Sequence, residues 1–290
     1  MSQPPDEALP PETTPAAITP TLRAYTPARV ALARSGISIA TAPTLAFALA
    51  YAQARDAVHS TLDVPPLLTA LRIRNLPAIA VQSAATNRAE YLRRPDLGRT
   101  LAPNSIAQLA AGPGTPSMQS HRMGGSSFAE ANDPPSPTQL TTLTIILADG
   151  LSAQATQTHA IPLLDALLPL LKEDWCLTPI VVATQARVAL ADPIAHALRA
   201  DVSLILIGER PGLSSPDSLG AYLTWAPRPG RTDAERNCIS NIRPPAPGHA
   251  GLDYATAAHK IAALLHQARR LCLTGIHLRE PDPAEISPCT

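Results

Sequence analysis

Three short runs of apolar residues in the C-terminal half of the chain constrain its fold more than any other feature. They lie at residues 143–148, 180–183 and 202–207. Each run is too short for a buried helix and is rich in β-branched residues, so each predicts a strand. Helical patterns separate the runs, and continuously apolar strands that alternate with helices are typical of a parallel sheet covered on both faces. The sequence therefore predicts an α/β fold, a Rossmann-like, doubly wound parallel sheet flanked by helices.

The helices between and around these strands show recognisable start signals. Ser152 is expected to cap a helix that Pro162 interrupts and that resumes through residue 171. A short helix at 192–198 and an amphipathic helix at 253–271 follow. Upstream, the pattern predicts a smaller, mainly helical region with a short strand at 78–81.

Polar residues follow the three predicted strands at positions 149–150, 185–188 and 208–210. The carboxyl ends of parallel strands meet at one edge of a sheet, and ligands bind there. The segment 208–243 starts from the same edge and is rich in Gly, Pro, Ser, Asp and Arg, so it is predicted to be loop for most of its length. Such a long loop is usually either disordered or functional, and the interleaved Tyr222, Trp225 and Ile239 favour function. The sequence thus predicts a binding crevice at this edge.

Composition divides the chain into five predicted parts. Residues 1–25 are a Pro-rich tail that we expect to be disordered. Residues 26–111 form the mainly helical N-terminal region, and the Gly-, Pro- and Ser-rich residues 112–140 a flexible linker. Residues 141–280 form the Rossmann-like domain, and residues 281–290 a C-terminal tail.

Charge, cysteine content and missing motifs exclude several classes of function. The 23 basic and 23 acidic side chains cancel, which gives no electrostatic footprint for nucleic acid or a membrane. A weakly charged surface instead indicates that a partner covers part of it. Cysteines without C-x-x-C spacing and an N-terminus without a signal-peptide pattern are expected of a cytoplasmic protein. No dinucleotide-binding or P-loop motif occurs, and no His or Cys spacing predicts a metal site.

Several single residues have both a structural and a functional interpretation. Ser152 follows Gly150 in half of a nucleophile elbow, but the second glycine is missing, and a helix cap explains it better. His159 and His259 lie on predicted helices and are expected to be ordinary core or surface residues. Glu209 either binds a ligand or forms a salt bridge with Arg210. Cys238 either contacts a ligand or is a small buried hydrophobe.

The order of longer motifs resembles one enzyme family. The segment GERPGLSSPDSLGAYLTWAPRPGRTDAERNCISNIR, the run YLRRPDLGR at 91–99 and Asp149-Gly150-Leu151-Ser152 closely resemble the small (light) subunit of ethanolamine ammonia-lyase. The resemblance implies a carbon–nitrogen lyase that uses adenosylcobalamin to convert ethanolamine to acetaldehyde and ammonia. It also implies a hetero-oligomer in which the large subunit holds the substrate site, in the cytoplasm and in some cases within a bacterial microcompartment. A non-catalytic cobalamin- or small-molecule-binding scaffold is the alternative.

The resemblance assigns cofactor contacts to Val188, Glu209 and Cys238, and no catalytic or metal-binding residue to this chain. Glu209 would accept hydrogen bonds from corrin amide arms, and the other two side chains would pack on apolar parts of the cofactor. Gly208 and Gly212 would let the backbone approach a bulky ligand. Ala186 departs from the family's pattern, which has glycine there, and this departure puts the Val188 contact in question if the loop needs a positive φ.

Overall fold

The computed structural model describes residues 28–30, 32–35, 37–111, 140–171, 174–245 and 250–278. The chain falls into two compact units, Met1–Ala52 and Gln53–Thr290. The predicted tails at 1–25 and 281–290 and the predicted linker as far as residue 139 lie outside the described residues. Within the part described, no helix is both long and apolar enough to cross a membrane.

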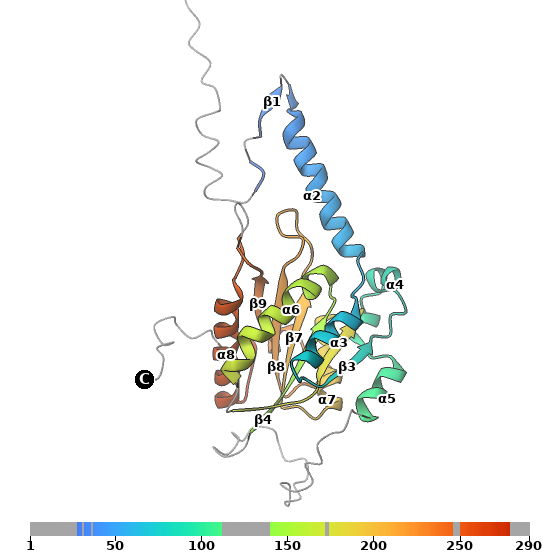
Figure 1. Cartoon of the computed structure of the whole chain (residues 1–290), viewed down its shortest axis with the longest axis vertical. Helices are drawn as coiled ribbons and strands as arrows, with labels where there is room; N and C mark the ends of the chain where they lie inside the picture. Colours follow the sequence, from blue (N-terminus) through green and yellow to red (C-terminus); the bar gives the residue numbers. More distant parts are fainter. Residues whose placement is uncertain are drawn as a thin grey trace, which may run out of the picture. The chain divides into compact units, whose positions relative to one another are not determined.

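The first unit contains a short hairpin and the beginning of a helix. Strand β1 (Arg34–Ser35) pairs antiparallel with β2 (Ser38–Ile39). Helix α2 (Thr41–His59) follows directly and continues past the unit boundary (Figure 1). The side chains of α2 within this unit are mostly exposed.

A mixed, mostly parallel sheet of seven strands forms the centre of the second unit (Figure 1). Six strands follow one another in the order β3-β6-β4-β7-β8-β9, and β5 pairs with β4. The first four are mutually parallel, whereas β8 and β9 are antiparallel additions. The predicted α/β fold is confirmed, and its three apolar runs lie in β4, β6 and β7. The strands are β3 (Ala78–Gln82), β4 (Thr141–Ala148), β5 (Trp175–Leu177), β6 (Ile180–Thr184), β7 (Val202–Gly208), β8 (Leu219–Trp225) and β9 (Asn237–Ile242).

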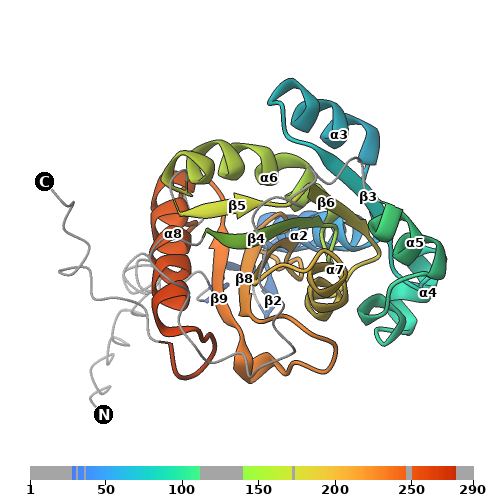
Figure 2. The same ribbon diagram turned by 90° about the horizontal axis from the view of Figure 1, so that it is seen from below.

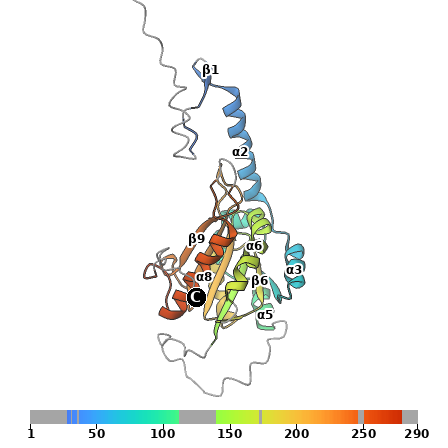
Figure 3. The same ribbon diagram turned by 60° about the vertical axis from the view of Figure 1, so that its left-hand side comes forward.

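Helices cover both faces of the sheet (Figure 2). Successive side chains of a strand point to opposite faces, and β4 shows this directly. Ile145 and Leu147 join a buried cluster with α3 (Val64–Ile73), α6 (Ala153–Leu167) and α8 (Tyr254–Leu271), and α6 and α8 lie side by side (Figure 3). Ile146 and Ala148 join a second cluster with α5 (Pro103–Ala111) and α7 (Ala191–Ala197).

The prediction that residues 208–243 are mostly loop is wrong, because the segment contains β8 and β9. Strand β8 pairs with β7 along its whole length, from Val202↔Trp225 to Gly208↔Leu219. Alternate side chains of β8 are fully buried on the α6 and α8 face, which gives the period-2 pattern of a strand. The Gly, Pro, Asp and Arg residues that suggested loop are concentrated in the two connections, 209–218 and 226–236.

The prediction that Pro162 interrupts its helix is also wrong, because α6 runs through it. Proline removes one helical hydrogen bond, but Ala160, Leu163 and Leu164 around it are buried, and this packing outweighs the lost bond. The predicted cap at Ser152 is confirmed, since its Oγ accepts a hydrogen bond from Ala155 N at 3.3 Å.

Candidate functional site

Two of the three predicted site residues follow the strands β6 and β7, which lie on either side of β4, and the third lies within a strand. Val188 begins the 3-10 helix η5 (Val188–Leu190) after β6, and Glu209 directly follows β7. Cys238 lies inside β9, where it pairs with Tyr222 of β8. Val188 and Tyr222 pack against the buried cluster on the α7 face. Because side chains opposite each other in an antiparallel pair share a face, Cys238 belongs to this face as well.

Glu209 is held by its neighbours through one carboxylate oxygen. Oε2 accepts hydrogen bonds from Ser218 Oγ at 2.7 Å and from Asn241 N at 3.1 Å. No hydrogen bond or ion pair joins it to Arg210, although both side chains are described, so the proposed brace to Arg210 is wrong. Oε1 has no hydrogen-bond donor among the residues described, and the side chain is half-buried. One oxygen therefore anchors the carboxylate while the other remains available to a ligand.

A bulge in β9 supplies the second of these bonds. The register changes from Leu219↔Ile242 to Ala221↔Ile239, so one residue of β8, Gly220, faces two of β9, Ser240 and Asn241. Asn241 adopts a φ of 59° there, and its N–H turns away from the β8 ladder towards Glu209. Bulges re-aim backbone groups and occur often beside binding sites.

Cys238 is exposed, so the interpretation as a small buried hydrophobe is wrong. Its Sγ lies 3.3 Å from Ser240 Oγ. The thiol borders an open pocket of about 320 Å³ that Lys260 of α8 and Asn241 also line. Across the strand pair stands Tyr222, which is half-buried. Burial raises the pKa of Tyr222, and the neighbouring Cys238 raises it further. Tyr222 belongs to the same face of the sheet as Cys238, and it is absent from the predicted site residues. Its position as an aromatic residue within the long polar segment is the sequence signal that could identify it.

The loop that presents Val188 is fixed by a buried carboxylate. Asp149 accepts hydrogen bonds from Gln185 N and Ala186 N, both at 2.9 Å. Arg88 pairs with the same carboxylate at 3.2 Å. Burial raises the pKa of Asp149 to about 6, against the opposing effect of these bonds and of Arg88. The positive φ in this loop, 55°, falls on Gln185 and not on Ala186. The alanine is therefore compatible with the loop, and the departure from the family's glycine does not disturb Val188.

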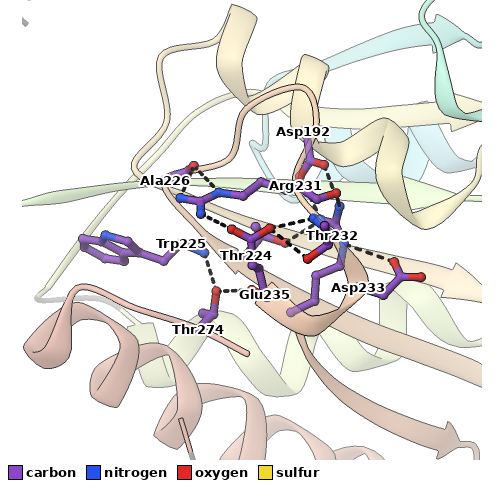
Figure 4. A network of polar contacts seen from close by, with 10 residues as sticks. Asp192, Thr224, Trp225, Ala226, Arg231, Thr232, Asp233, Glu235 and Thr274 are labelled. Atoms are coloured by element: carbon purple, nitrogen blue, oxygen red, sulfur yellow. Dashed lines mark hydrogen bonds and ion pairs between the residues drawn. The ribbon is translucent and has the colours of Figure 1, made fainter. Parts of the chain in front are cut away.

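A second buried ion pair ties the Val188 segment to the Cys238 segment (Figure 4). Arg236, two residues before Cys238, donates to both oxygens of Asp192 at 2.8 and 2.6 Å. Asp192 lies four residues after Val188. Arg236 also donates to Thr224 Oγ1 of β8 at 2.8 Å. The pair fixes the position of β9 relative to α7.

One of the two predicted glycines and both histidines can also be assigned. A Cβ on Gly208 would lie 2.0 Å from Ser152 O, so its missing side chain admits the chain's own backbone and not a ligand. His159 is buried and its Nδ1 lies 2.7 Å from the Tyr254 hydroxyl, while Asp217 lies 3.5 Å from Nε2. His259 is exposed. His159 is thus a residue of the core and His259 a residue of the surface.

Comparison with known proteins gives a consistent result. The family model for the ethanolamine ammonia-lyase light chain matches residues 17–279. The chain is 49% identical over 267 residues to the ethanolamine ammonia-lyase small subunit of Azotobacter vinelandii, covering 92% of this chain and 88% of that protein. It is 47% identical to the Pseudomonas aeruginosa small subunit (91% and 87% covered) and 48% identical to the Bradyrhizobium diazoefficiens one (92% of each).

The chain belongs to the ethanolamine ammonia-lyase light-chain family. The family resemblance read from the sequence is thereby confirmed. The chain is a small subunit of a carbon–nitrogen lyase that degrades ethanolamine with adenosylcobalamin and a large subunit, as predicted.

Glu209, Cys238 and Tyr222 fit such a cofactor. A corrin carries amide arms that donate hydrogen bonds, and the described structure leaves Oε1 of Glu209 without a donor. The exposed Cys238 thiol and the half-buried Tyr222 ring offer the polarizable and aromatic surface that packs on apolar parts of a large ligand.

Proposed function

We propose that Val188, Glu209 and Cys238 form one wall of the adenosylcobalamin site, which the large subunit completes. The observation that carries this proposal is the different environment of the two carboxylate oxygens of Glu209. Oε2 accepts hydrogen bonds from Ser218 and Asn241, whereas Oε1 has no donor among the residues described. An anchored carboxylate is pre-organised, so it loses little conformational entropy when a ligand donates to it.

In this proposal, the chain positions the cofactor and does not react. Glu209 accepts hydrogen bonds from amide N–H groups, and charge-assisted bonds of this kind are stronger than neutral ones. Val188 and Cys238, with Tyr222 between them, exclude water from the adjoining surface. The bound cofactor supplies the radical chemistry that the side chains of a protein lack. No acid–base role is assigned to this chain, because the substrate site is placed in the large subunit. We also place the assembled enzyme in the cytoplasm.

Replacing Glu209 by alanine tests the proposal. The change would leave cofactor amides unpaired, at a cost of roughly 1.5–3 kcal/mol. The affinity of the assembled complex for cyanocobalamin, measured by equilibrium dialysis, should therefore fall about 10- to 150-fold.

Ser218→Ala is the matched control, because it removes one anchoring bond and keeps the Glu209 carboxylate. It should lower the melting temperature about as much as Glu209→Ala does while reducing the affinity far less. Equal losses of affinity in the two variants, or no loss in Glu209→Ala, would reject the cofactor role of Glu209.

A further inference from the structure

The N-terminal part of α2 exposes large apolar side chains that the described residues of its unit leave about half or more accessible. Between Thr41 and Ala54 the sequence holds no charged side chain. Leu45, Phe47, Leu49 and Tyr51 are 64%, 47%, 61% and 58% exposed. A soluble surface helix normally carries a charged face opposite its apolar one, and a helix that is apolar all round is normally buried.

The exposed side chains point in two opposite directions. At 100° per residue, Leu45 and Leu49 lie on one side of α2, whereas Phe47 and Tyr51 lie on the other side, about 120–160° away. The rings of Phe47 and Tyr51 stack with centroids 6.4 Å apart, and Arg29 lies over the Phe47 ring at 5.7 Å. Both sides must therefore be covered for the helix to leave water.

Because exposed apolar side chains lie on both sides of α2, the three kinds of partner that could cover this helix can be distinguished. Pairing with the same helix of a second copy buries one stripe and leaves the opposite stripe in water. A membrane-surface helix needs a strongly polar face, and residues 41–54 provide none. A shallow groove of the kind that binds amphipathic helices covers one apolar face, whereas a groove deep enough to enclose the helix covers both sides.

We propose that residues 41–52 of α2 insert into an apolar groove of the large subunit. The family model spans residues 17–279, so the helix belongs to the shared region of a family whose members are small subunits. The inference rests on the pairing with a large subunit stated above, and it adds the surface through which that pairing occurs.

Two double variants test the inference, one for each side of the helix. Leu45→Glu/Leu49→Glu and Phe47→Glu/Tyr51→Glu place charge on exposed positions, and glutamate is a good helix former, so the fold should persist. Each should weaken binding to the purified large subunit by at least about 100-fold in a sedimentation titration. Circular dichroism and melting temperature verify folding.

Ile73→Glu/Ile106→Glu is the matched control, since both side chains are exposed, at 73% and 51%, but stand apart on α3 and α5. It should bind the large subunit like wild type. Unchanged binding by either α2 variant overturns the inference. The inference is also overturned if only one variant loses binding to the large subunit and that variant also loses self-association. This result would identify a second copy of the chain as the occupant of the surface. Failure of the wild-type chain to bind the large subunit would instead contradict the proposed function.

Discussion

At the scale of single residues, the reactivity of the Cys238 thiol can test the proposed cofactor wall. It is exposed on β9, whereas Cys176 and Cys272 are each half-buried. Among the three cysteines that the structure describes, iodoacetamide should therefore alkylate Cys238 first. In the complex with the large subunit, added cyanocobalamin should slow this reaction, because a packed ligand blocks access to the sulfur.

Peptide mass spectrometry of timed samples measures the rate at each cysteine. The same complex without cobalamin is the control, since it separates shielding by the large subunit from shielding by the cofactor. An alkylation rate at Cys238 that cobalamin leaves unchanged would count against its place in the wall.

His159 should make the stability of the fold depend on pH. Burial lowers its pKa, against a smaller opposing effect of Asp217, whereas an unfolded histidine titrates near about 6.5. Below that pH the unfolded chain binds more protons than the folded one, so the free energy of unfolding falls as the pH falls. Above about pH 6.5 the contribution is fully present.

Urea denaturation at pH 7.5 and 5.5 measures this effect. His159→Gln should lose less stability between the two pH values than wild type does. His259→Gln, at an exposed position, should behave like wild type. Equal pH dependence in all three proteins would show that His159 does not protonate on unfolding in this range.

The sequence could predict which residues matter more readily than how they are held. Glu209 and Cys238 were found from their motif, and Ser152 from its capping position. The partners of Glu209 were not predictable, because Asn241 reaches it only through a bulge whose position depends on the β8–β9 register. Arg210, the partner in the alternative interpretation, is adjacent in sequence but forms no hydrogen bond or ion pair with the carboxylate.

At the scale of elements, the Asp192–Arg236 pair is expected to dominate the stability of the contact between α7 and β9. The side chains are each only 2% exposed. Arg236→Met would leave a buried carboxylate without its partner, at a cost of about 3–5 kcal/mol. The double variant Asp192→Leu/Arg236→Met should recover much of that loss, because it removes both charges.

Guanidinium denaturation of the single and double variants gives the comparison. Arg94→Ala breaks an exposed pair with Asp96 and should leave the unfolding midpoint close to that of wild type. A double variant no more stable than Arg236→Met would mean that packing, and not the unpaired charge, causes the loss.

The predictability of the elements follows from where their side chains are buried. Strands β4 and β7 are buried on both faces, so their apolar runs were plain in the sequence. Strands β8 and β9 each keep part of one face accessible and adjoin segments rich in turn residues. Their sequences therefore mix apolar and polar residues and do not show the continuous apolar run of a buried strand. The predicted interruption at Pro162 does not occur, because the packing of side chains along α6 outweighs the local helix-breaking preference of proline.

At the scale of the whole molecule, the predicted division into regions 26–111 and 141–280 can be tested by cutting between them. Strand β3 pairs with β6 over five residues, from Ala78↔Ile180 to Gln82↔Thr184. Arg88 and Asp149 form a buried ion pair across the same boundary. A protease site inserted within 112–139 and then cleaved should give two fragments that elute together in size exclusion and separate only in denaturant.

Uncleaved protein carrying the same insertion is the control for that measurement. Separation of the fragments without denaturant would mean that the two regions are independent domains. Co-elution would mean that they share one sheet in solution as well.

The uncharged beginning of α2 also sets a condition on how a cell makes this protein. A copy that is not bound to the large subunit exposes four apolar side chains of α2 to water, Leu45, Phe47, Leu49 and Tyr51. Such surfaces bind chaperones and promote aggregation. Synthesis of the two subunits must therefore be matched in amount and in time. We expect any surplus of this chain to be removed by proteolysis or to precipitate, so that the supply of the large subunit limits the yield of this chain.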